Sequence, residues 1–177
     1  MDARISRENM ITFLLTTPMF DDLEPQQIRE IIHIVEAQKF EPGDIIFNEG
    51  DSGDAWYAIY HGEVEVLKKA DGGEKTIKTF GPRSCFGELA VLDGLPRSAT
   101  IRAKEGTVVL RVPQDKFSEL LDKDHLIAYK LIQHMALMLA SRQRANTETL
   151  SKLLLANELS DVREGIREIV GDSSVRE

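Results

Sequence analysis

The chain has 177 residues and a formal net charge of −8, with 22 lysine and arginine residues against 30 aspartate and glutamate residues. This length suits one domain with an extension and leaves no room for a second, enzymatic domain. The acidic balance argues against broad electrostatic binding to nucleic acid or to an anionic membrane, and no apolar run is long enough to suggest a membrane span.

Cysteine usage limits the chemistry further. Cys85 is the only cysteine, so an intramolecular disulfide and a multi-cysteine metal site are excluded. We expect Cys85 to be a small buried packing residue. The first residues mix charges with apolar side chains and do not resemble a signal peptide, so the expected location is the cytoplasm.

Residues 1–38 are predicted to form an N-terminal helical segment. Apolar residues recur at helical spacing from Ile5 to Ala37, and Pro18 divides them into two stretches. The second stretch begins near Pro25, because proline is tolerated in the first turn of a helix.

The period changes at Lys39, and residues 39–113 have the pattern of a β domain. Short strands are predicted over 45–47, 56–60, 64–67, 74–80, 98–103 and 107–113, with glycines at the turns between them. Many short strands with frequent turns are typical of a sandwich or barrel. Within them we interpret Trp56, Tyr57 and Tyr60 as packing residues rather than a surface on which a base stacks.

Residues 114–177 are predicted to be helical. A short helix over 116–122 precedes a much longer one, for which Asp124 is the candidate N-cap. Along the long helix, residues spaced by four and three form a partly polar heptad seam: Ile132, Ala136, Leu139, Gln143, Asn146, Leu150, Leu153 and Asn157. We prefer a parallel homodimer through this seam, with Asn146 setting the register, over a helix folded back on its own domain.

The segment Phe86–Thr100, FGELAVLDGLPRSAT, is the most informative part of the chain. Gly87 and Glu88 open an apolar helical turn, and Arg97 follows with small residues behind it. N–H groups at a helix start attract an anion, and a guanidinium fork suits two phosphate oxygens. Because Glu88 would repel a phosphate, we assign it to a sugar hydroxyl. The alternative is a surface turn with a weak Glu88–Arg97 ion pair.

This spacing resembles the phosphate-binding cassette of the cyclic nucleotide-binding domain family, which occurs in protein kinase regulatory subunits and catabolite activator proteins. The resemblance implies a mainly β fold with flanking helices (α+β): a jelly-roll sandwich or barrel of about eight strands, N-terminal helices and a long C-terminal helix. It implies that Glu88 binds the ribose 2′-hydroxyl and Arg97 the cyclic phosphate, in a bacterial member of the family. The other expected ligand-binding residues are Phe86, Gly87, Leu89, Ala90, Ser98 and Ala99.

The resemblance leaves the base open. Ser98 supplies the hydroxyl that kinase-type domains preferring cGMP carry after the arginine, whereas bacterial activators with serine there bind cAMP. The activator-like long helix makes us favour cAMP. Arg142 and Gln143 align with positions that touch adenine in the activators, although hydroxyl residues stand there in those proteins. A base contact by this pair is therefore a hypothesis, beside a plain solvated role.

Together these features predict a regulatory module that binds a cyclic nucleotide and repositions its C-terminal helix. An enzyme on the same nucleotide would need a metal pair or an activated nucleophile, and the sequence has no such cluster. The histidines, His33, His61, His125 and His134, lack paired ligand spacing, so we expect no metal, no cofactor and no catalytic residue. The expected partners are cAMP or cGMP, a second copy of the chain and an unidentified effector protein.

Two alternatives remain. The chain resembles the activators into the long helix, but only 22 residues follow Leu155, too few for a DNA-reading head. A transcription regulator fragment that lacks its DNA-binding domain is therefore one alternative, and a cGMP-binding regulator is the other. We expect no nucleic acid partner for the chain as it stands.

Overall fold

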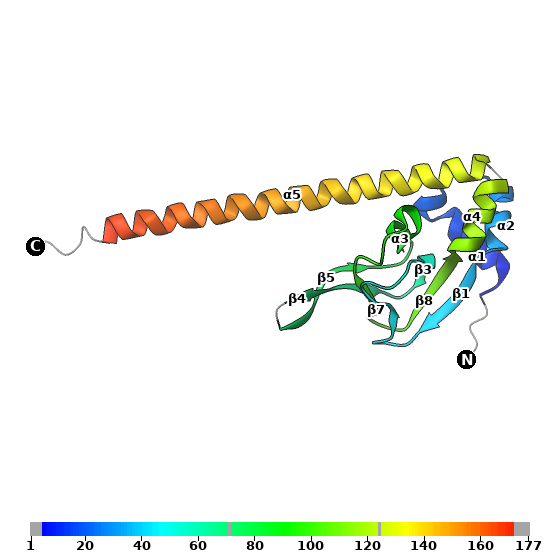
Figure 1. Ribbon diagram of the computed structural model, residues 1–177, viewed down its shortest axis with the longest axis horizontal. Helices are drawn as coiled ribbons and strands as arrows, with labels where there is room; N and C mark the ends of the chain where they lie inside the picture. The colour runs from blue at the N-terminus through cyan, green and yellow to red at the C-terminus, as the bar shows by residue number, and fades with distance from the viewer. Residues whose placement is uncertain (1–4, 71, 124, 172–177) are drawn as a thin grey trace, which may run out of the picture. The chain divides into compact units, whose positions relative to one another are not determined.

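The computed structural model describes residues 5–70, 72–123 and 125–171 (Figure 1). The chain divides into two compact units, Met1–Met135 and Ala136–Glu177. The first unit holds the N-terminal helices, two β-sheets and the start of the last helix. The part of the second unit that the structure describes is helical.

The N-terminal helices form where the sequence predicts them. They are α1 (Arg7–Leu15), the 3₁₀ turn η1 (Pro18–Phe20) and α2 (Pro25–Ile32), so the break at Pro18 is confirmed. The hydroxyl of Ser6 caps α1 by accepting from the Asn9 N–H at 3.2 Å. A capping box opens α2 just before its proline, and its buried isoleucines anchor it on the core.

In the part of the chain that the structure describes, eight antiparallel strands form two four-stranded sheets. The strands are β1 (Glu36–Phe40), β2 (Ile45–Phe47), β3 (Ala55–His61), β4 (Val64–Ala70), β5 (Gly73–Phe80), β6 (Cys85–Phe86), β7 (Thr100–Ala103) and β8 (Thr107–Pro113). One sheet has the order β1-β8-β3-β6 and the other β2-β7-β4-β5. The predicted jelly-roll architecture, mainly β with flanking helices, is confirmed.

Strand β3 separates two packed regions of the first unit. Tyr57 lies in the core between the sheets, with its ring stacked on that of Phe86 at 5.1 Å. The neighbouring residue, Trp56, packs at 5.9 Å against both Phe20 and Phe117, so it joins the sheet to the helices. Figure 1 shows α1, α2 and α4 gathered at one end of the strands. The interpretation of Trp56 and Tyr57 as packing residues is confirmed.

The sequence pattern missed two strands. β1 begins at Glu36, within the stretch that helical spacing covered, because pairing with β8 over five residues outweighs its weak local signal. Its residues alternate only between half-buried and exposed, so no apolar run marks the strand. β6 has two residues, too short for any period, and is defined by its pairing with Tyr57 and Ala58.

The C-terminal helices are α4 (Gln114–Lys123) and α5 (His125–Gly171). Ile127, Leu131 and Met135 are buried, so the start of α5 is part of the first unit's core. The Nε2 atom of His134 lies 2.8 Å from Oδ2 of Asp22, so this histidine joins α5 to the N-terminal helices. The predicted N-cap, Asp124, lies outside the described residues.

Among residues 5–70, 72–123 and 125–171, none of the helices combines the length and the apolar character that crossing a membrane requires. The same part of the chain contains no group of three histidine, cysteine, aspartate or glutamate side chains placed to hold a metal ion.

A glycine in the β3–β4 turn provides a stability test. Gly62 has φ +84°, and an added β carbon would lie 2.6 Å from Oγ1 of Thr107 and 2.7 Å from the carbonyl oxygen of Gly106. Gly43 has a similar φ, +92°, with nothing within 4 Å. We therefore expect Gly62→Ala to lower the free energy of unfolding by about 1–3 kcal/mol more than Gly43→Ala, because only Gly62 adds a clash to the backbone strain. Urea unfolding of the two variants checks this, and equal losses would contradict it.

Candidate functional site

The site begins where β6 turns into the short helix α3 (Glu88–Asp93). Gly87 caps this helix with φ +78°, a conformation that favours glycine. A β carbon at Gly87 would lie 2.9 Å from Nη1 of Arg97 and 3.4 Å from the rings of Phe47 and Tyr57. Glycine is thus required both by the backbone and by the close approach of the arginine.

The loop between β2 and β3 holds the cassette, Phe86–Thr100, in place. The Gly50 N–H donates to the carbonyl oxygen of Arg97 at 2.9 Å, and the Arg97 N–H donates to that of Asp51 at 2.8 Å. A β carbon at Gly53 would lie only 2.4 Å from the methyl carbon of Ala90. This loop therefore packs directly on α3 and pairs with the backbone of Arg97.

The Arg97 guanidinium is buried, with 1% of its side chain exposed. Nη1 donates to the carbonyl oxygen of Gly87 at 2.7 Å, and Nη2 donates to that of Ala55 at 2.7 Å. Nη2 also lies 3.1 Å from Oδ1 of Asp54. The ring of Phe47 covers the guanidinium, with its centroid 4.1 Å from the central carbon.

One donor of this cation is left over. The Nε of Arg97 is buried and has no hydrogen-bond partner among the described residues. A buried donor without an acceptor costs free energy, and the cost is greatest on a charged group. An anion with oxygen acceptors would supply the missing bond, so the residues present fit a phosphate at Arg97.

Glu88 takes the first position of α3, and it is 2% exposed. Burial of both Glu88 and Arg97 contradicts the alternative of a surface turn with a weak ion pair. A buried carboxylate and a buried guanidinium within one cassette suit a ligand that carries both hydroxyl groups and an anionic group.

The structure places most of the predicted binding residues together. Phe86, Glu88, Ala90, Arg97 and Ala99 are buried in or beside the cassette, around the half-buried Gly87. The side chains of Leu89, 43% exposed, and Ser98 face outward instead. Arg142 and Gln143 lie on α5 in the second unit, so their contact with a base stays a prediction.

A network of charged side chains that no sequence pattern predicted leads to Arg97. Asp54 accepts from Arg97 through Oδ1 and from Nη2 of Arg111 through Oδ2, at 2.7 Å in the latter case. Nη1 of Arg111 donates to Glu36 at 2.9 Å, and Lys116 donates to the other oxygen of Glu36 at 3.2 Å. These residues come from α4, β1, β8 and the loop just before β3, so no spacing in the sequence links them.

Within this charged network, the hydrogen bonds and opposite charges favour the ionised forms of Asp54, Glu36 and Arg111. Burial acts to raise the pKa of Asp54, but the hydrogen bond and charge of Arg111 outweigh it and hold that pKa below its usual value. Burial likewise acts to raise the pKa of Glu36, and the bonds from Lys116 and Arg111 lower it on balance. For Arg111, burial acts to lower the pKa, and the bonds to Asp54 and Glu36 raise it on balance.

A second missed contact holds the C-terminal end of the cassette. The Nζ of Lys68, on β4, donates to the carbonyl oxygen of Ser98 at 2.7 Å and to Oε1 of Glu49 at 2.6 Å. The Glu49 N–H in turn donates to Oγ1 of Thr100 at 3.0 Å. The C-terminal end of the cassette is thus fixed by residues distant in sequence, as its first residue, Phe86, is fixed by pairing with Tyr57 of β3.

Two pockets share Asp54 and Tyr57 in their linings and lie outside the cassette itself. One, of ≈ 480 Å³, is lined by β2, the loop after it and β3, including Phe47, Asp54 and Tyr57. The other, of ≈ 560 Å³, includes Asp54, Tyr57 and Arg111. Ligand pockets in proteins typically measure about 300–1,000 Å³, so each has room for a small molecule.

Comparison with known proteins agrees with this geometry. The model of the cyclic nucleotide-binding domain family matches residues 37–124. A cAMP-dependent protein kinase regulatory subunit of Emericella nidulans is 37% identical over 122 residues, which are 68% of this chain and 29% of that protein. The chain thus spans about a third or less of the length of the curated relatives it matches first.

Solved structures of the same kind are also similar. The catabolite activator protein of Thermus thermophilus superposes with a TM-score of 0.68 at 29% identity, over 77% of this chain and 63% of that one. The regulatory subunit of a cAMP-independent protein kinase A from Trypanosoma brucei has a TM-score of 0.67 at 29% identity, over 83% of this chain and 51% of that one. Through residues 37–124, the chain belongs to the cyclic nucleotide-binding domain family.

Proposed function

We propose that this chain is a regulatory module that binds a cyclic nucleotide, preferably cAMP, in its cassette. The observation that carries the proposal is the buried Arg97, whose Nε lacks a hydrogen-bond partner among the described residues. Arg97 binds the cyclic phosphate, and Glu88 accepts a hydrogen bond from the ribose 2′-hydroxyl. The fold alone does not decide the ligand, because the similar regulatory subunit from Trypanosoma brucei belongs to a cAMP-independent protein kinase A. The residues of the cassette therefore carry the proposal.

The proposed module binds its ligand and does not react with it. Arg97 and Glu88 are both occupied by binding roles, and neither is a base placed to activate water. The ligand acts by shifting a conformational equilibrium, since it forms contacts in one state that are absent in the other. An anion at Arg97 competes with the bonds to Asp54 and to the Gly87 carbonyl, which makes α3 the first element to respond.

The response passes to the C-terminal helices and, through them, to an effector protein in a reducing cytoplasm. Leu150 and Leu153, which are exposed on α5, lie in the seam of a parallel homodimer. Ser98 favours one alternative ligand, because its exposed side chain carries a hydroxyl that a guanine amino group can bond. We therefore include cGMP in the binding experiments.

The first test removes the phosphate-binding cation. Arg97→Ala is expected to weaken cAMP binding by several kcal/mol, because two bonds to a charged group contribute about 1.5–3 kcal/mol each. Calorimetric titration measures the change. Arg102→Ala is the control, since Arg102 pairs with Glu65 within the β2-β7-β4-β5 sheet. Thermal melting shows that each variant is folded. A folded Arg97→Ala that binds like the parent would refute the assignment.

The second test concerns the sugar. A 2′-deoxy ligand lacks the hydroxyl that donates to Glu88, so we expect 2′-deoxy-cAMP to bind more weakly than cAMP by about 1–3 kcal/mol, the contribution of a hydrogen bond to a charged group. Glu88→Gln should reduce this difference, because a neutral amide oxygen accepts a weaker hydrogen bond from the hydroxyl than a carboxylate does. Competition of both ligands and cGMP for one fluorescent analogue gives the values. Equal affinity for the ribo and deoxy forms would remove Glu88 from the site.

The third test concerns assembly. Leu153 lies on the predicted seam, and Leu155, also exposed, lies two residues away on the opposite side of the helix. Leu153→Glu is expected to shift a dimer towards monomer, whereas Leu155→Glu leaves it intact. Sedimentation of the full chain, with and without cAMP, measures both. A parent chain that stays monomeric at high concentration contradicts the homodimer.

A further inference from the structure

Asp54 is shared between two arginines with unequal geometry. Its Oδ2 lies 2.7 Å from Nη2 of Arg111, whereas its Oδ1 lies 3.1 Å from Nη2 of Arg97. The Asp54 side chain is 61% exposed, so it is free to turn toward either cation. The shorter bond to Arg111 therefore sets the orientation of the carboxylate, and the pair with Arg97 is the weaker of the two.

Arg111 is itself held on both sides. It stands on the central strand β8, opposite Tyr57 of β3 and opposite Glu36 of β1. Its Nη1 donates to Glu36, which also accepts from Lys116 on α4. Only 18% of the Arg111 side chain is exposed, and its planar fork binds two carboxylates, Glu36 on β1 and Asp54 just before β3.

An anion and Asp54 compete for the same cation. A carboxylate that closes fully on Arg97 would neutralise the guanidinium and repel a phosphate that approaches it. Arg111 prevents this, because it holds Asp54 at the longer distance from Arg97 and balances the carboxylate charge. The charge on Arg97 thus stays available to a ligand.

We propose that Arg111 is a positioning residue for ligand binding, which acts through Asp54 to keep Arg97 available to the anionic group of the ligand. This inference rests on the proposed function and adds to it a residue outside the cassette. Removal of Arg111 leaves Asp54 with Arg97 as its cationic partner. The carboxylate then moves toward Arg97 and competes with the phosphate of the ligand.

A double-mutant cycle with cAMP tests the proposal by calorimetry on the full chain. We expect Arg111→Gln to raise the dissociation constant about tenfold. Asp54→Asn, which removes the competing charge, should bind within about threefold of the parent or more tightly. In the Asp54→Asn background, Arg111→Gln should change the constant by less than about threefold, because the carboxylate that Arg111 restrains is gone. A merely structural role for Arg111 would not be rescued by a second substitution.

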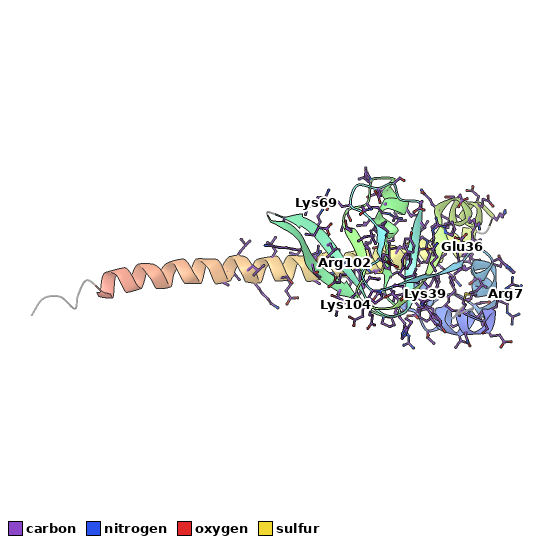
Figure 2. All side chains as sticks on the ribbon, turned by 90° about the horizontal axis from the view of Figure 1, so that it is seen from below. Arg7, Glu36, Lys39, Lys69, Arg102 and Lys104 are labelled. Carbon is purple, nitrogen blue, oxygen red and sulfur yellow. The ribbon has the colours of Figure 1, made fainter. Side chains whose placement is uncertain are left out.

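Two further variants complete the experiment. Arg102→Gln also removes one positive charge that is paired with a carboxylate, here Glu65 on β4. This variant should bind like the parent. Figure 2 shows the two regions, with Glu36 toward the helical end of the first unit and Arg102 among the strands. Arg111→Lys keeps the charge and should restore most of the affinity that Arg111→Gln loses.

The possible failures are distinguishable. If the parent binds neither cAMP nor cGMP, the proposed function fails and this inference fails with it. If the parent binds but Arg111→Gln binds equally well, only this inference is overturned. A tenfold loss that persists in the Asp54→Asn background also overturns it, because Arg111 then acts by a route that does not involve Asp54.

Discussion

The burial of one guanidinium determines how the site is built. A buried charge is costly unless nearly all of its donors are bonded, and Arg97 meets this demand with two main-chain carbonyls, a carboxylate and an aromatic face. These partners come from three separate parts of the chain, so β2, the beginning of β3 with the residue before it, and the start of α3 must meet at one point. The donor that they leave unbonded is the place where a ligand contributes.

Close backbone approaches and main-chain hydrogen bonds hold Arg97 in this position. Gly87 allows the arginine to approach the turn, and Gly53 allows the β2–β3 loop to lie against α3. The main chain of Arg97 pairs with the same loop through two hydrogen bonds. Because these contacts are backbone bonds and close approaches, a shift of the loop or of α3 moves the guanidinium directly.

Local patterns in the sequence predicted the cassette, the helices and most strands, because each depends on residues close together in the chain. β1 was missed because its polar residues form a strand only through pairing with β8. Asp54 and Arg111 were missed for the same reason, since they meet only after β8 lies beside β3. For Asp54, the turn-forming residues just before β3 were a signal for a loop but not for a binding role.

The affinity of this site is a difference between two sets of bonds. A phosphate gains the Nε donor of Arg97, but it competes with acceptors that the protein already provides to Nη1 and Nη2. Main-chain carbonyls carry no net charge and tolerate an anion nearby, whereas Asp54 repels it. The charged residue beside Arg97 therefore has more influence on affinity than the neutral ones, and the orientation of a single carboxylate decides how much of the arginine's charge a ligand experiences.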